Sequence, residues 1–124
     1  MSTCDSGCEQ FSYGKGKYRV TAHVTRMGED VVVHLGGGTK WHVGAVVLCE
    51  PDYTSEKVTT SVLSCFTHRE EYVARPVAEA LCKKLGVKVV CVSGIHIDNP
   101  SKAEIKRLVS NCTRLQKALV KKYR

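Results

Sequence analysis

The first half of the chain alternates apolar and polar residues, a period of two that is typical of strands with one buried face. The alternation is clear in residues 17–27, and after a turn residues 31–35 form a second apolar segment. These two segments predict a β-hairpin. His23 and His34 are interpreted as ordinary strand residues. Glycines at residues 36–38 interrupt the pattern and predict the end of the second strand.

Two further strands follow in the predicted order. Residues 43–49 form a nearly continuous apolar run, which indicates a strand that is buried on both faces. Pro51 and Asp52 supply the next turn. Residues 57–65 are rich in valine and threonine, whose branched side chains favour a strand.

The apolar spacing changes to that of an α-helix in the second half of the chain. Residues 72–85 carry apolar side chains at helical spacing, between a capping-box pattern at Thr67 and Glu70 and a terminating Gly86. Pro76 lies inside this segment, so we expect a kink or two shorter helices.

A fifth strand and a long last helix complete the pattern. Residues 87–93 predict the strand, and Ser101 with Glu104 forms a capping box that begins a helix extending to about Lys122. The predicted buried stripe of this helix is Ile105, Leu108, Val109, Cys112, Leu115 and Leu119. The order of elements favours an α+β domain, with a mainly antiparallel β-sheet of about five or more strands and two principal helices on one face.

Length and composition fit one domain with a single core. The chain has 124 residues, and we expect a domain at residues 17–124 preceded by a flexible N-terminal arm at residues 1–16. Residues 1–10 contain neither a basic residue nor an apolar run, so we expect no secretory signal and no membrane helix. A cytoplasmic location follows from this interpretation.

The cysteines predict buried thiols rather than a disulfide framework. The chain has seven cysteines, an odd number. Those with mainly apolar neighbours are Cys49, Cys82, Cys91 and Cys112. A thiol in such surroundings behaves as a small apolar side chain, and disulfides are rare in a reducing compartment.

The net charge of +7 leaves two interpretations open. A basic surface attracts nucleic acids and other anions, so a nucleic-acid-binding module is an alternative. Much of the basic excess falls on the polar side of the last predicted helix, where a solvated helix face is the simpler explanation. Aromatic residues make up only 6% of the chain, which disfavours stacking on single-stranded bases.

The segment LGGGTKWHVGA, residues 35–45, is the first candidate site. Consecutive glycines can turn backbone N–H groups toward one anion, and Lys40 would add a positive charge for a phosphate. A glycine-rich hairpin loop explains the same residues without a ligand, because Walker and Rossmann spacings are absent. Trp41 would stack on a planar ligand or cap an edge of the core, and core packing is the simpler interpretation.

Histidines stand at or near several predicted strand ends: His42, His68 and His96. If these strand ends meet, the imidazoles share one pocket. A zinc site is not supported, because closely spaced CxxC and HExxH patterns are absent. His96 with Asp98 would form an acid–base pair, although Asp98 and Asn99 also suit the turn before the last helix.

Three motifs together resemble a known family. GGGTKWHVGAV, FTHREE and VSGIHIDNPSKAEI, spread over residues 36–105, are similar to the LpdD-like family of prenylated-flavin chaperones. The resemblance implies an accessory protein without enzymatic activity, which binds prenylated FMN or FMN as cargo and supplies or protects it for a UbiD-type aromatic acid decarboxylase. It also implies a fold similar to small proteasome-assembly-chaperone-like domains, and a homodimer.

The same resemblance implies which residues bind the flavin. The residues carried over from the motifs are Gly36, Gly37, Gly38, His42, Gly44, His68, Gly94, His96, Asp98 and Asn99. For such a ligand Lys40 and Arg69 would attract the phosphate, and Trp41 or Phe66 would form a flat wall for the ring system. Alternatives besides nucleic-acid binding are a decarboxylase subunit that uses His96 and Asp98 in catalysis and an assembly chaperone without a ligand.

Overall fold

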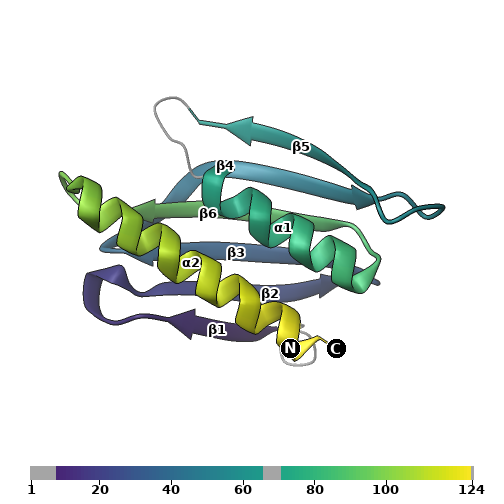
Figure 1. Ribbon diagram of the computed structural model, residues 1–124, viewed down its shortest axis with the longest axis horizontal. Coiled ribbons are helices and arrows are strands. Elements are labelled where there is room, and N and C mark those ends of the chain that lie inside the picture. Colours follow the sequence, from purple (N-terminus) through teal and green to yellow (C-terminus); the bar gives the residue numbers. More distant parts are fainter. Residues whose placement is uncertain (1–7, 66–70, 124) are drawn as a thin grey trace.

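A six-stranded sheet with two α-helices on one face forms the part of the chain that the computed structural model describes, residues 8–65 and 71–123 (Figure 1). The strands are β1 (Glu9–Tyr13), β2 (Val20–Met27), β3 (Asp30–Gly38), β4 (Lys40–Pro51), β5 (Val58–Ser64) and β6 (Val89–His96). The helices are the short 3-10 helix η2 (Gly16–Tyr18), α1 (Glu71–Leu85) and α2 (Lys102–Lys122). The predicted α+β fold class is confirmed.

The last strand, β6, lies inside the sheet instead of at its edge. The strand order is β1-β2-β3-β6-β4-β5, so β6 separates β3 from β4 although only Thr39 lies between those two strands in the sequence. The β3–β6 pair is parallel and the other neighbouring pairs are antiparallel. As a result, the carboxyl ends of β3 and β6 lie together beside the start of β4.

The core lies between the sheet and the two α-helices. Buried side chains there include Val33 of β3, Val47 of β4 and Leu115 of α2. The prediction of buried thiols is confirmed for Cys49, Cys82, Cys91 and Cys112. Burial raises the pKa of the Cys112 thiol to about 12, so the thiol stays protonated and packs as an apolar group.

Helix α2 begins at the predicted capping box. Ser101 Oγ accepts a hydrogen bond from the Glu104 backbone N–H over 3.1 Å, and the Glu104 carboxylate accepts one from the Ser101 N–H over 3.0 Å. The same carboxylate accepts a hydrogen bond from the Tyr18 hydroxyl and pairs with Lys17. In the predicted stripe Ile105 and Val109 are exposed, and the buried members are Leu108, Cys112, Leu115 and Leu119.

Two strands differ from the sequence-based expectation. β3 does not end before residues 36–38 but continues through them, because Gly36 and Gly37 pair with both β2 and β6. Glycine in a strand permits a close approach of neighbouring chain segments. β4 is not buried on both faces: Leu48 is 43% exposed, because the helices cover only one face of the sheet.

The predicted flexible arm is wrong for residues 9–13, which form β1 at the edge of the sheet. Ser12 shares a hydrogen bond of 2.8 Å with Thr21 of β2. The Tyr123 hydroxyl donates a hydrogen bond to the Glu9 carboxylate over 2.7 Å, which links β1 to the end of α2. The folded domain therefore includes residues that precede the predicted boundary.

Helix α1 is one continuous helix rather than two. It runs through Pro76, whose ring removes a single backbone hydrogen bond near the helix start, while Val73 and Val77 are buried on either side of it. Gly86 follows with φ +67°, and its N–H donates to the Cys82 carbonyl over 2.8 Å, as predicted for a helix end. The capping-box pattern before this helix lies outside the described residues. None of the described helices has the length and apolar character needed to cross a membrane.

Candidate functional site

The candidate site lies at one end of the sheet, where β3 ends, β4 begins and β6 ends. Gly36 pairs with Gly94, and both Gly38 and Lys40 pair with His96. The glycine-rich segment is therefore the neighbour of the segment that follows β6. We call Trp41, His42, His96 and Asp98 the strand-end cluster.

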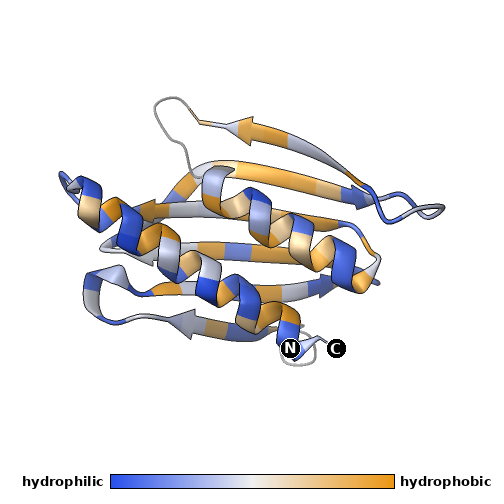
Figure 2. Ribbon diagram, viewed as in Figure 1, coloured by the Kyte–Doolittle hydropathy of each residue, from blue (hydrophilic) through white to orange (hydrophobic). Residues whose placement is uncertain are grey.

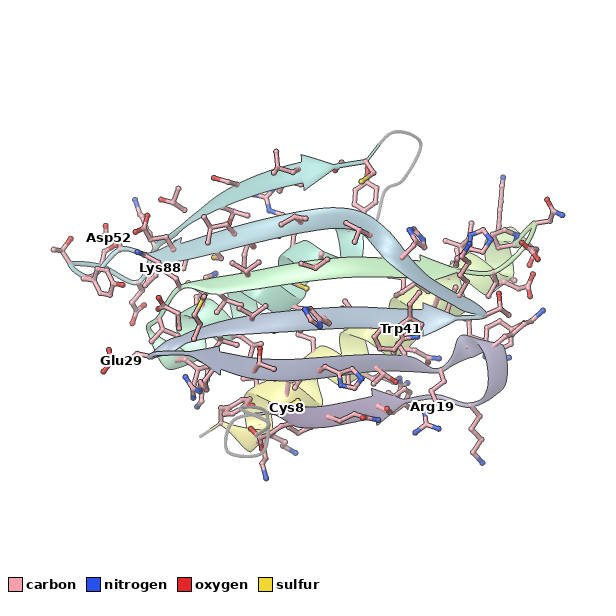
Figure 3. The ribbon with its side chains drawn as sticks, turned by 180° about the vertical axis from the view of Figure 1, so that it is seen from behind. Cys8, Arg19, Glu29, Trp41, Asp52 and Lys88 are labelled. Carbon is pink, nitrogen blue, oxygen red and sulfur yellow. The ribbon has the colours of Figure 1, made fainter. Side chains whose placement is uncertain are left out.

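Trp41 lies on the open face of the sheet, the face without helices (Figure 3). This residue is 46% exposed, and its indole lies so close over Gly36 that a Cβ at that glycine would overlap the ring. His23 of β2 contacts the indole edge-on, with 5.5 Å between ring centroids. The core-packing interpretation of Trp41 is therefore wrong, and part of the ring is accessible to a planar ligand.

Gly94 makes room for the backbone of β4. The pairing of β4 with β6 is irregular just after Trp41, and there the His42 carbonyl lies against Gly94, where a Cβ would overlap it. Gly44 links the same part of β4 to the end of β5, because its carbonyl accepts a hydrogen bond from the Cys65 N–H over 2.8 Å. The glycines thus have a packing reason: they let β4 approach its neighbours closely enough to place Trp41 over β3.

The triple glycine is neither a hairpin loop nor a loop of free phosphate donors. Its first two residues belong to the ladders of β3 with β2 and β6. The Gly38 N–H donates to the Arg19 carbonyl over 3.4 Å, and the following N–H, of Thr39, donates to the His96 carbonyl over 2.7 Å. With these donors engaged inside the sheet, the exposed Lys40 is the described group of this segment that suits a phosphate.

His96 is oriented by a carboxylate at the start of the following turn. Its Nε2 lies 3.0 Å from Asp98 Oδ1, and its ring meets the His42 ring edge-on, with 6.0 Å between centroids. The Asp98 side chain is 89% exposed, so the pair is open to solvent. Asn99 follows with φ +46°, a turn conformation that asparagine tolerates. An imidazole and a carboxylate at this spacing can hydrogen-bond to carbonyl and N–H groups of a ligand.

The structure brings together two of the three histidines that were expected to meet, His42 and His96. His68 lies outside the described residues, as do Phe66 and Arg69. Within residues 8–65 and 71–123, no three His, Cys, Asp or Glu side chains gather as ligands for a metal ion.

His23 is a site residue that sequence reasoning missed. The alternation in β2 placed it correctly on the polar face of that strand. Its contact with Trp41 depends on the pairing of β2 with β3 and on the position of β4, which is not a neighbour of β2. No local signal in the sequence indicates either feature.

Comparisons with known proteins agree with this architecture. Residues 14–124 match a family described as the prenylated flavin chaperone LpdD-like domain. A curated relative, Protein LpdD of Lactiplantibacillus plantarum, is 23% identical over 95 residues, which are 77% of this chain and 70% of the relative. A solved structure from a chaperone complex for yeast 20S proteasome assembly has a TM-score of 0.55 and 8% identity, and the match covers 91% of this chain and 98% of that chain. At this identity the structural similarity shows the fold alone, and it confirms the predicted proteasome-assembly-chaperone-like architecture.

Proposed function

The chain belongs to the prenylated flavin chaperone LpdD-like family, and on this basis we propose that it is a non-catalytic accessory protein that binds prenylated FMN, or FMN, as cargo. It supplies or protects this flavin for a UbiD-type decarboxylase of aromatic acids. The main support for this proposal is the length of chain that matches the family. The matched residues, 14–124, include both α-helices and the whole strand-end cluster. The proposal places the chain in the cytoplasm and assigns it no membrane and no nucleic-acid partner.

The strand-end cluster suits the chemistry of a flavin. The half-exposed Trp41 offers a flat wall for the ring system, and His96 with Asp98 offers hydrogen bonds to its polar edge. The residues proposed to contact the flavin are Lys40, Trp41, His42, His68, Arg69, His96, Asp98 and Asn99. The residues proposed to shape the site around it are Gly36, Gly37, Gly38, Gly44 and Gly94.

Titration of the purified chain with FMN and with prenylated FMN, under anaerobic conditions, tests this proposal. Trp41 is the single tryptophan of the chain, so quenching of its emission reports on the site directly. Trp41→Ala and His96→Ala, followed by flavin fluorescence, are expected to weaken binding about tenfold or more, because each removes a contact worth about 1.4 kcal/mol.

Tyr53→Ala is the matched control for Trp41→Ala. Tyr53 is an aromatic residue that is 73% exposed in the connection between β4 and β5, away from the strand-end cluster. The control is expected to keep wild-type affinity. Absence of binding at high micromolar flavin would contradict the proposal, and equal losses in Trp41→Ala and Tyr53→Ala would contradict the location of the site.

A second candidate function is favoured by the His96–Asp98 pair. An imidazole 3.0 Å from a carboxylate is also suited to proton transfer, so a decarboxylase subunit could use these two residues directly. In that case the chain by itself would release CO2 from an aromatic acid, and His96→Ala would abolish the release. The accessory role predicts no turnover by the chain alone.

Two copies of the chain associate through the open face of the sheet. Leu48 and Leu63 are 43% and 73% exposed there. Their neighbours on the paired strands are Val46, Val90 and Val92. Figure 2 shows the apolar stretches of β4, β5 and β6. An exposed apolar face is self-complementary in a two-fold symmetric dimer. Light scattering is expected to give the mass of two chains for the wild type and of one chain for Leu48→Glu. A wild-type mass of one chain at high protein concentration would contradict this association.

A further inference from the structure

A groove with a basic rim lies between the C-terminal halves of α1 and α2. Figure 1 shows these two helices on the same face of the sheet. The volume of the groove is about 550 Å³. The half-buried Ala80 and Val120 form an apolar floor. The exposed lysines on its rim are Lys83 and Lys84 of α1 and Lys117 and Lys121 of α2. Together with Gln116, we call these residues the lysine groove.

Neighbouring carboxylates compensate the positive charge of the lysine groove only in small part. Among the salt bridges of the described residues, none involves a lysine of the groove. Glu79, one helical turn before Lys83, has its carboxylate engaged by Arg75 over 3.1 Å and by the Thr60 hydroxyl. Lys83 contributes least among the groups that lower the pKa of this carboxyl. A groove lined by charges of one sign attracts a ligand of the opposite sign.

Favourable interactions with helix ends explain only part of this arrangement. Lysines in the last turn of a helix stabilise it through the helix dipole, and Lys83, Lys84, Lys121 and Lys122 are placed in this way. Lys117 lies before the last turn of α2, yet it lines the groove. The dipole also gives no reason for lysines of two helices to share one apolar floor.

We propose that the lysine groove docks an acidic segment of the protein that receives the flavin. This inference rests on the proposed function, because the receiving protein is then the decarboxylase. Carboxylates of the segment pair with the rim lysines, and one of its apolar side chains packs on Ala80 and Val120. The groove lies at the end of α2 opposite the turn that holds Asp98, so docking leaves the strand-end cluster accessible (Figure 1).

A protein segment fits the groove better than a nucleic acid does. Binding of single strands relies on aromatic side chains or arginine planes on which bases stack. The described residues that line this groove are lysines, a glutamine and small aliphatic side chains. The apolar floor suits an aliphatic side chain, which a nucleic acid lacks.

Fluorescence anisotropy of a labelled peptide, with glutamates and interspersed leucines, tests the inference on the full chain. The groove variant is Lys117→Glu with Lys121→Glu, and the matched control is Lys106→Glu with Lys122→Glu. Both pairs lie on α2, change the net charge equally and include one lysine of the last turn, but only the first pair lines the groove. The groove variant is expected to bind the peptide at least about tenfold more weakly, and the control to stay within about twofold of the wild type.

Several results would overturn the inference. Equal losses in the two variants would show a general effect of charge, and absence of wild-type binding at high micromolar peptide would show that the groove takes no acidic segment. Tighter binding of a labelled single-stranded oligonucleotide than of the peptide, lost in the groove variant, would assign the groove to nucleic acid.

Flavin titration of the same variants separates this inference from the proposed function. The groove variant is expected to bind flavin with wild-type affinity, because the groove and the strand-end cluster lie apart. If the wild type binds the peptide in the groove but no flavin, the proposed function fails and the acidic docking site stands. If it binds flavin but no peptide, the docking inference alone fails.

Discussion

The two faces of the sheet are built from alternate residues of the same strands, yet they have different properties. The face under α1 and α2 carries mainly buried apolar residues, such as Val33 and Val47. The open face carries Trp41, which is labelled in Figure 3. His23, which contacts Trp41, and the exposed Leu63 lie on the same face. The period of two in a strand therefore separates residues that stabilise the fold from residues that are free to contact partners.

The largest expected effect comes from Gly94, a residue that faces the open side of the sheet and is nevertheless needed for the fold. Gly94→Ala would place a Cβ against the His42 carbonyl, which belongs to the backbone and cannot rotate away. We expect a loss of more than about 4 kcal/mol in the free energy of unfolding, or failure to fold. Gly36→Ala meets the movable Trp41 ring instead, so it should lose less stability and shift the tryptophan emission. Urea unfolding compares the two, and equal stability of Gly94→Ala and wild type would contradict the close backbone contact.

A matched pair of leucines tests the comparison directly. Leu115 of α2 is 1% exposed in the core between the helices and the covered face. Leu63 of β5 is 73% exposed on the open face. Leu115→Ala should lower the free energy of unfolding by about 2–5 kcal/mol, because it leaves a cavity. Leu63→Ala should change it by no more than about 0.5 kcal/mol in a single chain. Losses of similar size, measured in urea under conditions that keep both variants monomeric, would show that the open face is buried.

A smaller effect is expected from the acid dependence of the contacts that fasten the start of α2 to η2. The Ser101 N–H, followed by Lys17 and the Tyr18 hydroxyl, lowers the pKa of Glu104 from 4.5 to about 2. Because this pKa is depressed in the folded state, the stabilisation is present above pH 4.5 and is lost as the pH falls toward 2. Glu104→Gln should flatten this part of the stability profile. A variant that keeps the wild-type slope between these pH values would assign the acid dependence to other carboxyl groups.

The smallest effect concerns a polar group on the covered face. Ser93 is fully buried, and its hydroxyl has no hydrogen-bond partner in the described structure. Removing an unsatisfied hydroxyl relieves a desolvation penalty, so Ser93→Ala should leave the stability unchanged or raise it by about 1 kcal/mol. The urea midpoint measures this. A clear loss of stability would reveal a hydrogen-bond partner for this hydroxyl on the covered face.

Parts of the candidate site were predictable, and parts were not. The sequence indicated Trp41, His42, His96 and Asp98, because polar and aromatic residues at strand ends exceed what a turn needs. It did not indicate that Trp41 lies on the open face or that His23 contacts it, since both depend on the strand order. The glycines were recognised as unusual, but their role is close packing within the sheet instead of a loop.

Local chemistry in the sequence determined the elements of this protein. The capping box of Ser101 and Glu104, the terminating Gly86 and the alternation in β2 each act within a few residues, so they can be read without the fold. Only the tertiary structure decided that β6 enters between β3 and β4 and that residues 9–13 join the sheet. Strand partners are chosen by hydrogen bonds and packing between residues far apart in the chain, and a single sequence carries no record of which distant segments meet.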